Sequence, residues 1–176
     1  MSQEKQIPIV FKFIVKVSQV MESITRKLIL LFMSAMVILV ALNVVTRYTL
    51  GSSIGASYEL SIHSYIYTVY LGTALALKKR AHPKMKYLYN KIKGKPKKIV
   101  ILINFTALIV LMIFFTVFGF IETMDKWSIN AKMFDYPLGA IFFAVPFCGI
   151  ITLFFIGEIL IKGFYYEKEG EGYQWW

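Results

Sequence analysis

The chain has 176 residues, of which 57% are hydrophobic and 16% aromatic, and it carries a formal net charge of +10. A soluble domain of this size would not contain several uncharged apolar runs of about 20 residues, the length that crosses a bilayer as a helix. These features exclude an ordinary soluble domain and predict one all-α integral membrane domain over residues 1–176. With Cys148 as its single cysteine, the chain cannot form an internal disulfide or a redox-active thiol pair.

The first predicted element is an amphipathic helix over residues 7–27. Apolar residues recur there at helical spacing, and Lys12 and Lys16 lie on the opposite face. We expect this helix to lie in the interface plane, with its lysines at the lipid headgroups. Packing on a soluble partner is the alternative, but the segment leads directly into an apolar run, which favours the membrane surface.

Four membrane-spanning helices are predicted to follow, because a chain in hydrocarbon must satisfy its backbone hydrogen bonds internally. They cover residues 28–46, 56–77, 99–121 and 138–161, with a basic loop over 78–98 and a flexible tail over 162–176. The loop carries ten Lys or Arg, the N-terminal segment five and the tail two, whereas the two remaining connections share three. Since cytoplasmic segments are enriched in Lys and Arg, both termini and the basic loop are predicted to be cytoplasmic.

The basic loop contains no Asp or Glu, so we expect it to contact anionic lipid headgroups. The loop residues predicted to make this contact are Lys78, Lys79, Arg80 and Lys84. The apolar spans on either side argue against a nucleic-acid partner. An acidic cytoplasmic protein bound to the loop stays open as an alternative, and such a complex would dissociate at high salt.

Ionisable groups also gather near the outer ends of the first two spans. Glu59 and His63 are one helical turn apart, and Arg47, followed by Tyr48, is close enough along the chain to reach Glu59. A proton or ion relay is one interpretation. A structural cluster that sets how the first two helices meet is the favoured one, because the residues lie near a helix end rather than at mid-membrane.

Small residues recur every three or four positions on the second and fourth spans, which predicts close helix packing there, either within the chain or with a partner. The residues are Ser61, Ser64, Thr68, Gly72 and Ala76 on the second span, and Ala140 and Ala144 on the fourth. At the inner boundary, Glu158 and Lys162 are expected to form an i,i+4 ion pair.

The inventory of reactive side chains argues against an enzyme. A dihaem four-helix cytochrome needs four axial histidines, whereas this chain has only His63 and His82. No catalytic residue, metal site or cofactor is therefore predicted in this chain.

The stretch from Asn43 to Leu88 resembles the signature of the small Q-type (DctQ-like) membrane subunit of TRAP transporters, the tripartite ATP-independent periplasmic transporters. The resemblance extends over roughly Leu28–Leu160. The matching positions are Arg47-Tyr48, Ser53, Glu59, the run Leu71–Ala76, His82, Pro137 and Val145–Gly149. The chain departs from the family pattern at Tyr58 and His63, where a second acid and an arginine are common, and at Lys86, where an aspartate is common.

The resemblance implies a non-catalytic scaffold subunit of a sodium-coupled secondary transporter in the bacterial inner membrane. The implied partners are a large M-type membrane subunit, which would hold substrate and sodium, and a periplasmic binding protein that delivers an organic acid. C4-dicarboxylates, sialic acids and similar carboxylates are the implied substrates, and no substrate-binding residue is expected in this subunit. The outer connections, residues 48–57 and 122–137, would help to receive the binding protein.

A different class of function stays open beside the transporter subunit. The chain could form a self-sufficient homo-oligomeric channel or small exporter, with Glu59 and His63 lining the pore.

Overall fold

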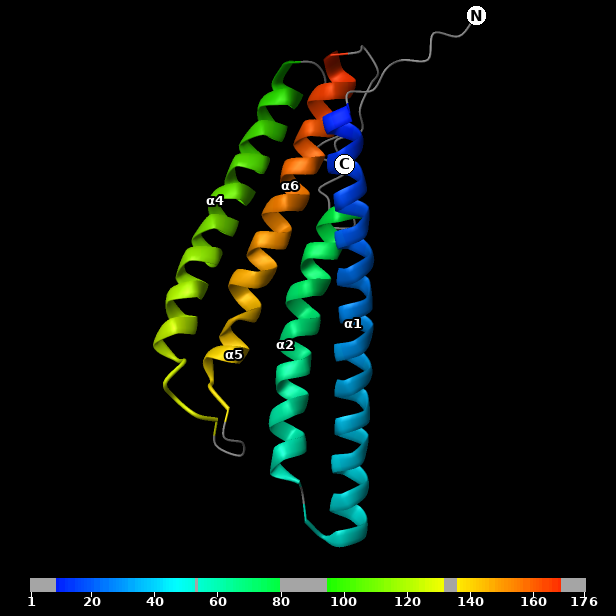
Figure 1. Ribbon diagram of the computed structural model, residues 1–176, viewed down its shortest axis with the longest axis vertical. Helices are drawn as coiled ribbons and strands as arrows, with labels where there is room; N and C mark the ends of the chain where they lie inside the picture. The colour runs from blue at the N-terminus through cyan, green and yellow to red at the C-terminus, as the bar shows by residue number, and fades with distance from the viewer. Residues whose placement is uncertain (1–8, 53, 80–94, 132–135, 169–176) are drawn as a thin grey trace, which may run out of the picture.

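The computed structural model describes residues 9–52, 54–79, 95–131 and 136–168. They form α1 (Ile9–Leu50), α2 (Gly55–Lys78), α4 (Lys95–Asp125), the short α5 (Gly139–Phe142) and α6 (Ala144–Lys168). Figure 1 shows the four long helices side by side in one elongated bundle, with α2 and α6 between α1 and α4. Outside the helices, the described residues contain one isolated bridge, between Asn130 and Pro137, and no strand. The predicted all-α class is confirmed.

The structure has one N-terminal helix where we predicted two. Helix α1 runs for 42 residues without a break at Lys27, so residues 9–27 are its first half rather than a separate helix. The physical reason is local, because the sequence around Lys27 contains no Gly or Pro that would end a helix. An exposed ion pair between Glu22 and Arg26, one turn apart at 2.9 Å, adds a small stabilisation across the same segment.

The bundle consists of two helical hairpins. The first pairs α1 with α2 through a tight connection in which Gly51 adopts a left-handed φ of 67°, a conformation that favours glycine. The second pairs α4 with α6. Contacts between α2 and α6 join the two hairpins, so these helices form the seam of the molecule.

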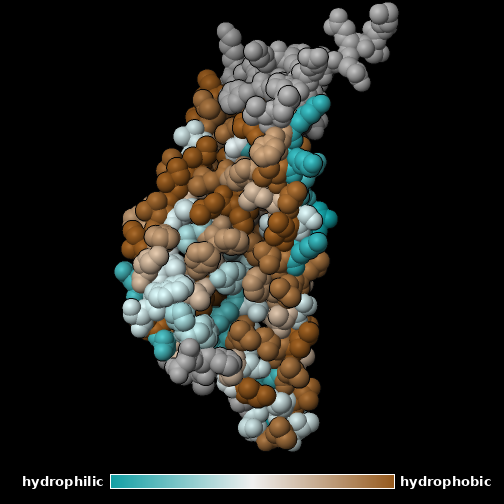
Figure 2. All heavy atoms as spheres, in the orientation of Figure 1, coloured by the Kyte–Doolittle hydropathy of each residue, from teal (hydrophilic) through white to brown (hydrophobic). Residues whose placement is uncertain are grey.

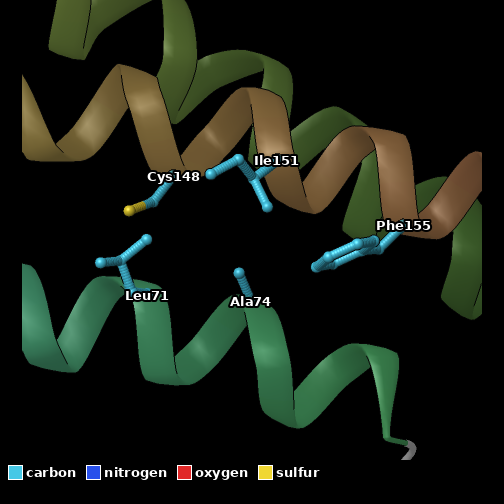
Figure 3. Packing of buried hydrophobic residues seen from close by; sticks show 5 residues of the cluster. All are labelled: Leu71, Ala74, Cys148, Ile151 and Phe155. Carbon is cyan, nitrogen blue, oxygen red and sulfur yellow. The ribbon is translucent and has the colours of Figure 1, made fainter. Parts of the chain in front are cut away.

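Two apolar clusters fill the space between the helices. The central one joins Leu71 and Ala74 of α2 to Cys148, Ile151 and Phe155 of α6, and Figure 3 shows these side chains pointing toward one another across the seam. The second cluster extends the seam to α4 and comprises Leu77, Ile101, Phe105, Ile156 and Ile159. Burial of apolar surface therefore holds α4, α6 and α2 together along much of their length.

Three of the four predicted spans meet a simple test of length and apolar composition. They are Phe11–Leu50, Ile99–Asp125 and Gly139–Gly163 in the described part of the chain. Helix α2 has 24 residues, or roughly 36 Å, which is long enough to cross the hydrocarbon, but it is richer in Tyr, Ser and Thr. A total of four spans therefore stays a prediction.

The predicted boundaries of the basic loop and the tail need correction where the structure describes them. Residues 95–98, expected in the loop, begin α4, and residues 162–168, expected in the tail, end α6. Continuous helix-forming sequence carries both helices past the apolar run into charged residues. The rest of the loop and tail, residues 80–94 and 169–176, lies outside the described residues.

The α4–α6 contact makes a specific prediction about two glycines. A Cβ added at Gly119 would lie 2.8 Å from Val145 Cγ1 and 3.0 Å from Pro146 Cδ, whereas one added at Gly157 would meet nothing within 4 Å. Because Val145 and Pro146 are stiff side chains, Gly119→Ala should lower the free energy of unfolding by about 1–3 kcal/mol. Thermal unfolding of the purified chain in mild detergent should show this loss for Gly119→Ala and none for the matched control Gly157→Ala. Equal melting temperatures for the two variants would contradict the close contact of Gly119 with Val145 and Pro146.

Candidate functional site: a buried ionic cluster and an exposed face of α2

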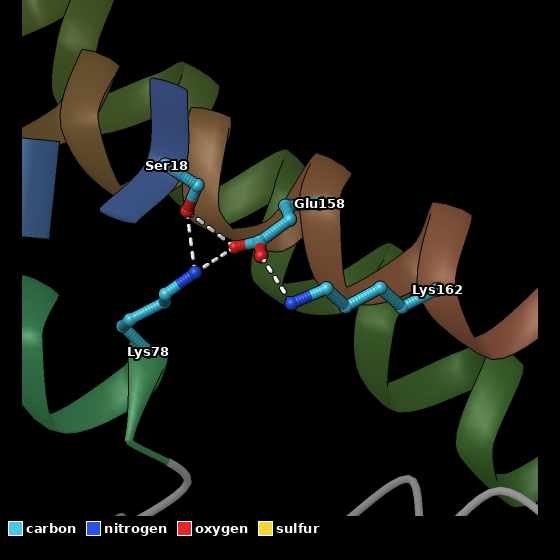
Figure 4. Close-up of polar contacts among 4 residues, drawn as sticks. All are labelled: Ser18, Lys78, Glu158 and Lys162. Carbon is cyan, nitrogen blue, oxygen red and sulfur yellow. Dashed lines mark hydrogen bonds and ion pairs between the residues drawn. The ribbon is translucent and has the colours of Figure 1, made fainter. Parts of the chain in front are cut away.

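Four side chains from three helices meet where α2 ends (Figure 4), and we call them the ionic cluster: Ser18, Lys78, Glu158 and Lys162. The Lys78 ammonium pairs with Glu158 Oε2 and donates a hydrogen bond to Ser18 Oγ. The Ser18 hydroxyl donates to the same carboxylate oxygen at 2.5 Å. On the other side, Lys162 Nζ lies 2.6 Å from Glu158 Oε1, so the predicted i,i+4 pair is present.

The ionic cluster is buried to different degrees. The Glu158 side chain is 1% exposed, Lys78 10% and Lys162 28%. A carboxylate this deep must be paired, because an isolated buried charge loses its hydration without compensation. Ser18 and Lys78 hydrogen-bond to Oε2 of Glu158, and Lys162 pairs ionically with Oε1, so the cluster ties α1, α2 and α6 together.

The position of Lys78 corrects one sequence-based expectation. We predicted that Lys78 would contact lipid headgroups, but its ammonium turns inward to Glu158 and lies 5.4 Å from the Phe155 ring centroid. The reason is the nearby carboxylate of another helix, which residues close to Lys78 in the sequence do not reveal. Ser18, 140 residues from Glu158, gave no signal in the sequence.

The remaining predicted headgroup contacts are not tested by the structure. Lys12, Lys16 and Lys79 are exposed, as a headgroup contact requires. Arg80 and Lys84 lie outside the described residues, and so does His82. Contact of these residues with anionic lipid stays a prediction.

At the opposite end of the seam, polar contacts join α2 to the connection between α4 and α6. The Tyr136 hydroxyl lies 2.5 Å from His63 Nδ1, and the two rings meet edge to face at 5.4 Å. The Tyr67 hydroxyl donates to the Ala140 carbonyl at 2.6 Å, while its ring stacks on Phe32 at 4.9 Å. Tyr136 and Tyr67 were not among the predicted site residues. Tyr67 lies on α2, and only the folded bundle brings Tyr136 and Ala140 to this helix.

The structure shows where each residue of the predicted cluster lies, but it does not show the four in contact with one another. The four residues are Arg47, Tyr48, Glu59 and His63. His63 is engaged by Tyr136, and Glu59 is half-buried one turn earlier on α2. Arg47 is exposed near the end of α1, and Tyr48 is 86% exposed. A contact between Arg47 and Glu59 stays a prediction.

The predicted small-residue faces lie partly in the core. Ser61, Ser64 and Ala144 are buried, and Thr68, Ala76 and Ala140 are half-buried. Gly72 differs, because a Cβ added there would meet nothing within 4 Å. Gly72 therefore does not serve a close approach of two helices inside this chain, and the deepest contacts of α2 come instead from Leu71 and Ala74.

One face of α2 has no covering helix in the described part of the chain. It consists of Tyr58, Ile62, Tyr65, Val69, Gly72 and Thr73, which share one side of the helix. Tyr65 is 56% exposed, and Thr73 is also exposed. We call this surface the tyrosine face of α2.

The exposed surface of α4 has a different composition. The exposed large side chains of α4 are aliphatic, Met or Phe, such as Val110, Phe114 and Phe118. Figure 2 shows mostly brown surface over the upper part of this side of the molecule, with paler and teal side chains toward its lower end. Within the described residues, no group of three or more His, Cys, Asp or Glu is placed to hold a metal ion.

The fold and these surfaces define a multi-pass helical membrane protein built from two hairpins. Comparison with known proteins identifies its family. The family profile of the DctQ component of tripartite ATP-independent periplasmic transporters matches residues 36–164, so the chain belongs to this family. A TRAP transporter small permease protein of Haemophilus influenzae is 27% identical over 139 residues, which cover 79% of this chain and 86% of the relative.

Family membership makes the chain a component of a TRAP transporter, and with its apolar helices it indicates a protein of the bacterial inner membrane. It also implies partnership with the large membrane subunit and a periplasmic binding protein. The resemblance found in the sequence is confirmed.

The ionic cluster predicts an asymmetric response to mutation. Glu158→Gln leaves two cations close together without a carboxylate, so it should lower the free energy of unfolding by about 3–5 kcal/mol. The double variant Lys78→Met/Glu158→Gln removes one of these cations and should recover part of the loss. Thermal unfolding of the purified chain in detergent measures the loss of stability in the single variant and in the double variant.

Glu22→Gln is the matched control, since Glu22 also pairs with a cation at i,i+4 but on the exposed surface. It should cost no more than about 0.5 kcal/mol. A loss for Glu158→Gln as small as that of the control would show that the buried pairing contributes little.

Proposed function

We propose that this chain is the non-catalytic scaffold subunit of a sodium-coupled TRAP transporter that imports an organic acid delivered by a periplasmic binding protein. In this proposal the large membrane subunit holds substrate and sodium, and the small subunit braces it in the bilayer. All four long helices cross the membrane, with both termini and the basic loop in the cytoplasm.

The observation that carries the proposal is the tyrosine face of α2. Helix α2 lies alongside α1 and α6, at the same level as apolar spans, yet its uncovered face carries hydroxyl groups and a glycine. The Thr73 hydroxyl already donates to the Val69 carbonyl at 2.9 Å. Lipid tails offer no hydrogen-bond partner to the Tyr hydroxyls, whereas a neighbouring protein helix does. Gly72 leaves room for such a helix to approach closely. The tyrosine face therefore supports contact with another membrane protein.

The outer turn of the first hairpin supports a second contact, with the binding protein. Tyr48 is 86% exposed, Leu50 73% and Ile54 47%, and Figure 1 shows the α1–α2 turn extending beyond the end of the second hairpin. Exposed aromatic and aliphatic side chains at a projecting turn are suited to transient docking of a soluble partner.

The rival proposal, a homo-oligomeric channel or exporter, places Glu59 and His63 in a pore. The His63 contact with Tyr136 within the chain favours a structural role for this residue. Purification from native membranes separates the two proposals. A large polytopic subunit in roughly equal amount supports the scaffold, whereas homo-oligomers whose flux is abolished by Glu59→Gln support the channel.

Gly72→Leu tests the tyrosine face directly. Because a Cβ at Gly72 meets nothing within this chain, the variant should insert and unfold like the wild type. Where a partner helix packs against this face, the larger side chain should reduce co-purified large subunit by about tenfold or more, since about 1.4 kcal/mol of lost affinity is a tenfold change.

Gly157→Leu is the control, because Gly157 also has open space but lies on α6, away from the tyrosine face. It should retain the large subunit. Equal recovery of the large subunit with both variants would place the contact elsewhere on the molecule.

A further inference from the structure

The first half of α1 carries a charged flank whose position along the bundle is unusual. Its residues, here called the basic flank, are Lys12, Lys16, Glu22, Ser23, Arg26 and Lys27. At 100° per residue they share one side of the helix. Lys12, Lys16 and Lys27 are exposed, and Arg26, 55% exposed, pairs with Glu22. Four cations and one carboxylate leave this flank positively charged.

The part of the flank that contains Arg26 and Lys27 lies level with the middle of the bundle. On the opposite side of the same turns, Met21 and Leu28 pack against the central apolar cluster of Leu71, Ala74, Cys148, Ile151 and Phe155. Ile151 is the midpoint of the apolar stretch Gly139–Gly163 on α6. Arg26 and Lys27 lie between Met21 and Leu28 in the sequence, so they stand beside the centre of a span rather than at its end.

The position of α4 in the second hairpin also places Arg26 and Lys27 level with apolar surface. Ile101 of α4 packs in one cluster with Leu77, whose neighbour Lys78 contacts Ser18. Level with Ser18, α4 already exposes apolar side chains such as Leu102 and Ile103. Lys27 follows Ser18 by nine residues, about 14 Å further toward the outer end.

Figure 2 shows this offset as teal side chains along the edge of the molecule formed by α1, beside brown surface on the α4 side at the same level. A flat bilayer perpendicular to the bundle that covers the apolar surface of α4 would also enclose Arg26 and Lys27. Charged side chains in hydrocarbon are costly and are found beside protein partners or water.

We propose that the part of the basic flank around Arg26 and Lys27 is covered by the large membrane subunit, through a surface that presents carboxylate or backbone carbonyl acceptors within the membrane. The proposal rests on the proposed function and adds a second contact, on a different helix from the tyrosine face. Charge complementarity identifies the occupant, because lipid tails cannot accept hydrogen bonds from Lys or Arg and an acidic protein surface can.

Cysteine labelling of the complex in native membranes tests the proposal. Ser23→Cys places a thiol on the basic flank and keeps every cation, and Cys148→Ala removes the one native thiol, which is buried. The probe is a membrane-impermeant maleimide, applied to opened membranes that contain the chain with or without the large subunit. Val110→Cys, on the exposed side of α4, gives the reaction rate of a thiol that faces lipid. Ser52→Cys, in the α1–α2 turn, gives the rate of a thiol that faces water.

The expected result is that Ser23→Cys reacts when the chain is alone and reacts at least tenfold more slowly in the complex. Reaction at the Ser52→Cys rate in both samples would overturn the proposal, because the flank would then face water. Reaction as slow as that of Val110→Cys in both would overturn it as well, because no partner would be needed for protection. A wild-type chain that brings no large subunit would overturn the proposed function itself, and this proposal with it.

Discussion

A carboxylate that is 1% exposed stays charged in a helical bundle only beside fixed cations, and Glu158 meets this constraint with Lys78 and Lys162. The arrangement of the helices depends on it at one end of the molecule. Lys78 links the end of α2 to Glu158 of α6, and the Ser18 hydroxyl links α1 to both residues. These contacts hold the two hairpins together at this end, because a shift of α2 would separate Lys78 from Glu158 and a shift of α1 would remove the Ser18 hydroxyl from both.

The seam between the hairpins changes in character along its length. Next to the ionic cluster lies an apolar segment of Leu71, Ala74 and their partners on α6, and beyond it come the hydroxyl contacts of Tyr67 and Tyr136. Apolar packing supplies area without direction, whereas ion pairs and hydrogen bonds demand particular geometry. Directional contacts at both ends of a non-directional core make the two hairpins suited to act as one rigid brace.

Much of the helical framework was predictable from local pattern. The uncharged runs predicted the apolar stretches of α1, α4 and α6, because a bilayer selects for length and composition that a single window of sequence displays. The Glu158–Lys162 pair was predictable for the same reason, since both residues lie on one turn of one helix. Contacts that depend on a residue from another helix were less predictable. Lys78 was assigned to lipid, but its ammonium pairs with Glu158. Gly72 was assigned to helix packing, and no helix that the structure describes lies against it, so its packing with a partner stays a prediction.

The amino-acid sequence by itself determined the class of protein, its family and the position of its apolar helical runs, because hydropathy, charge asymmetry and motif order are properties of short segments. Only the tertiary structure decided which charges are buried and which faces are left uncovered. Ser18, Lys78 and Glu158 are separated by 60 to 140 residues, and their meeting depends on the register between helices. Register is set by the sum of many small packing contacts across the seam, which no single segment of sequence contains.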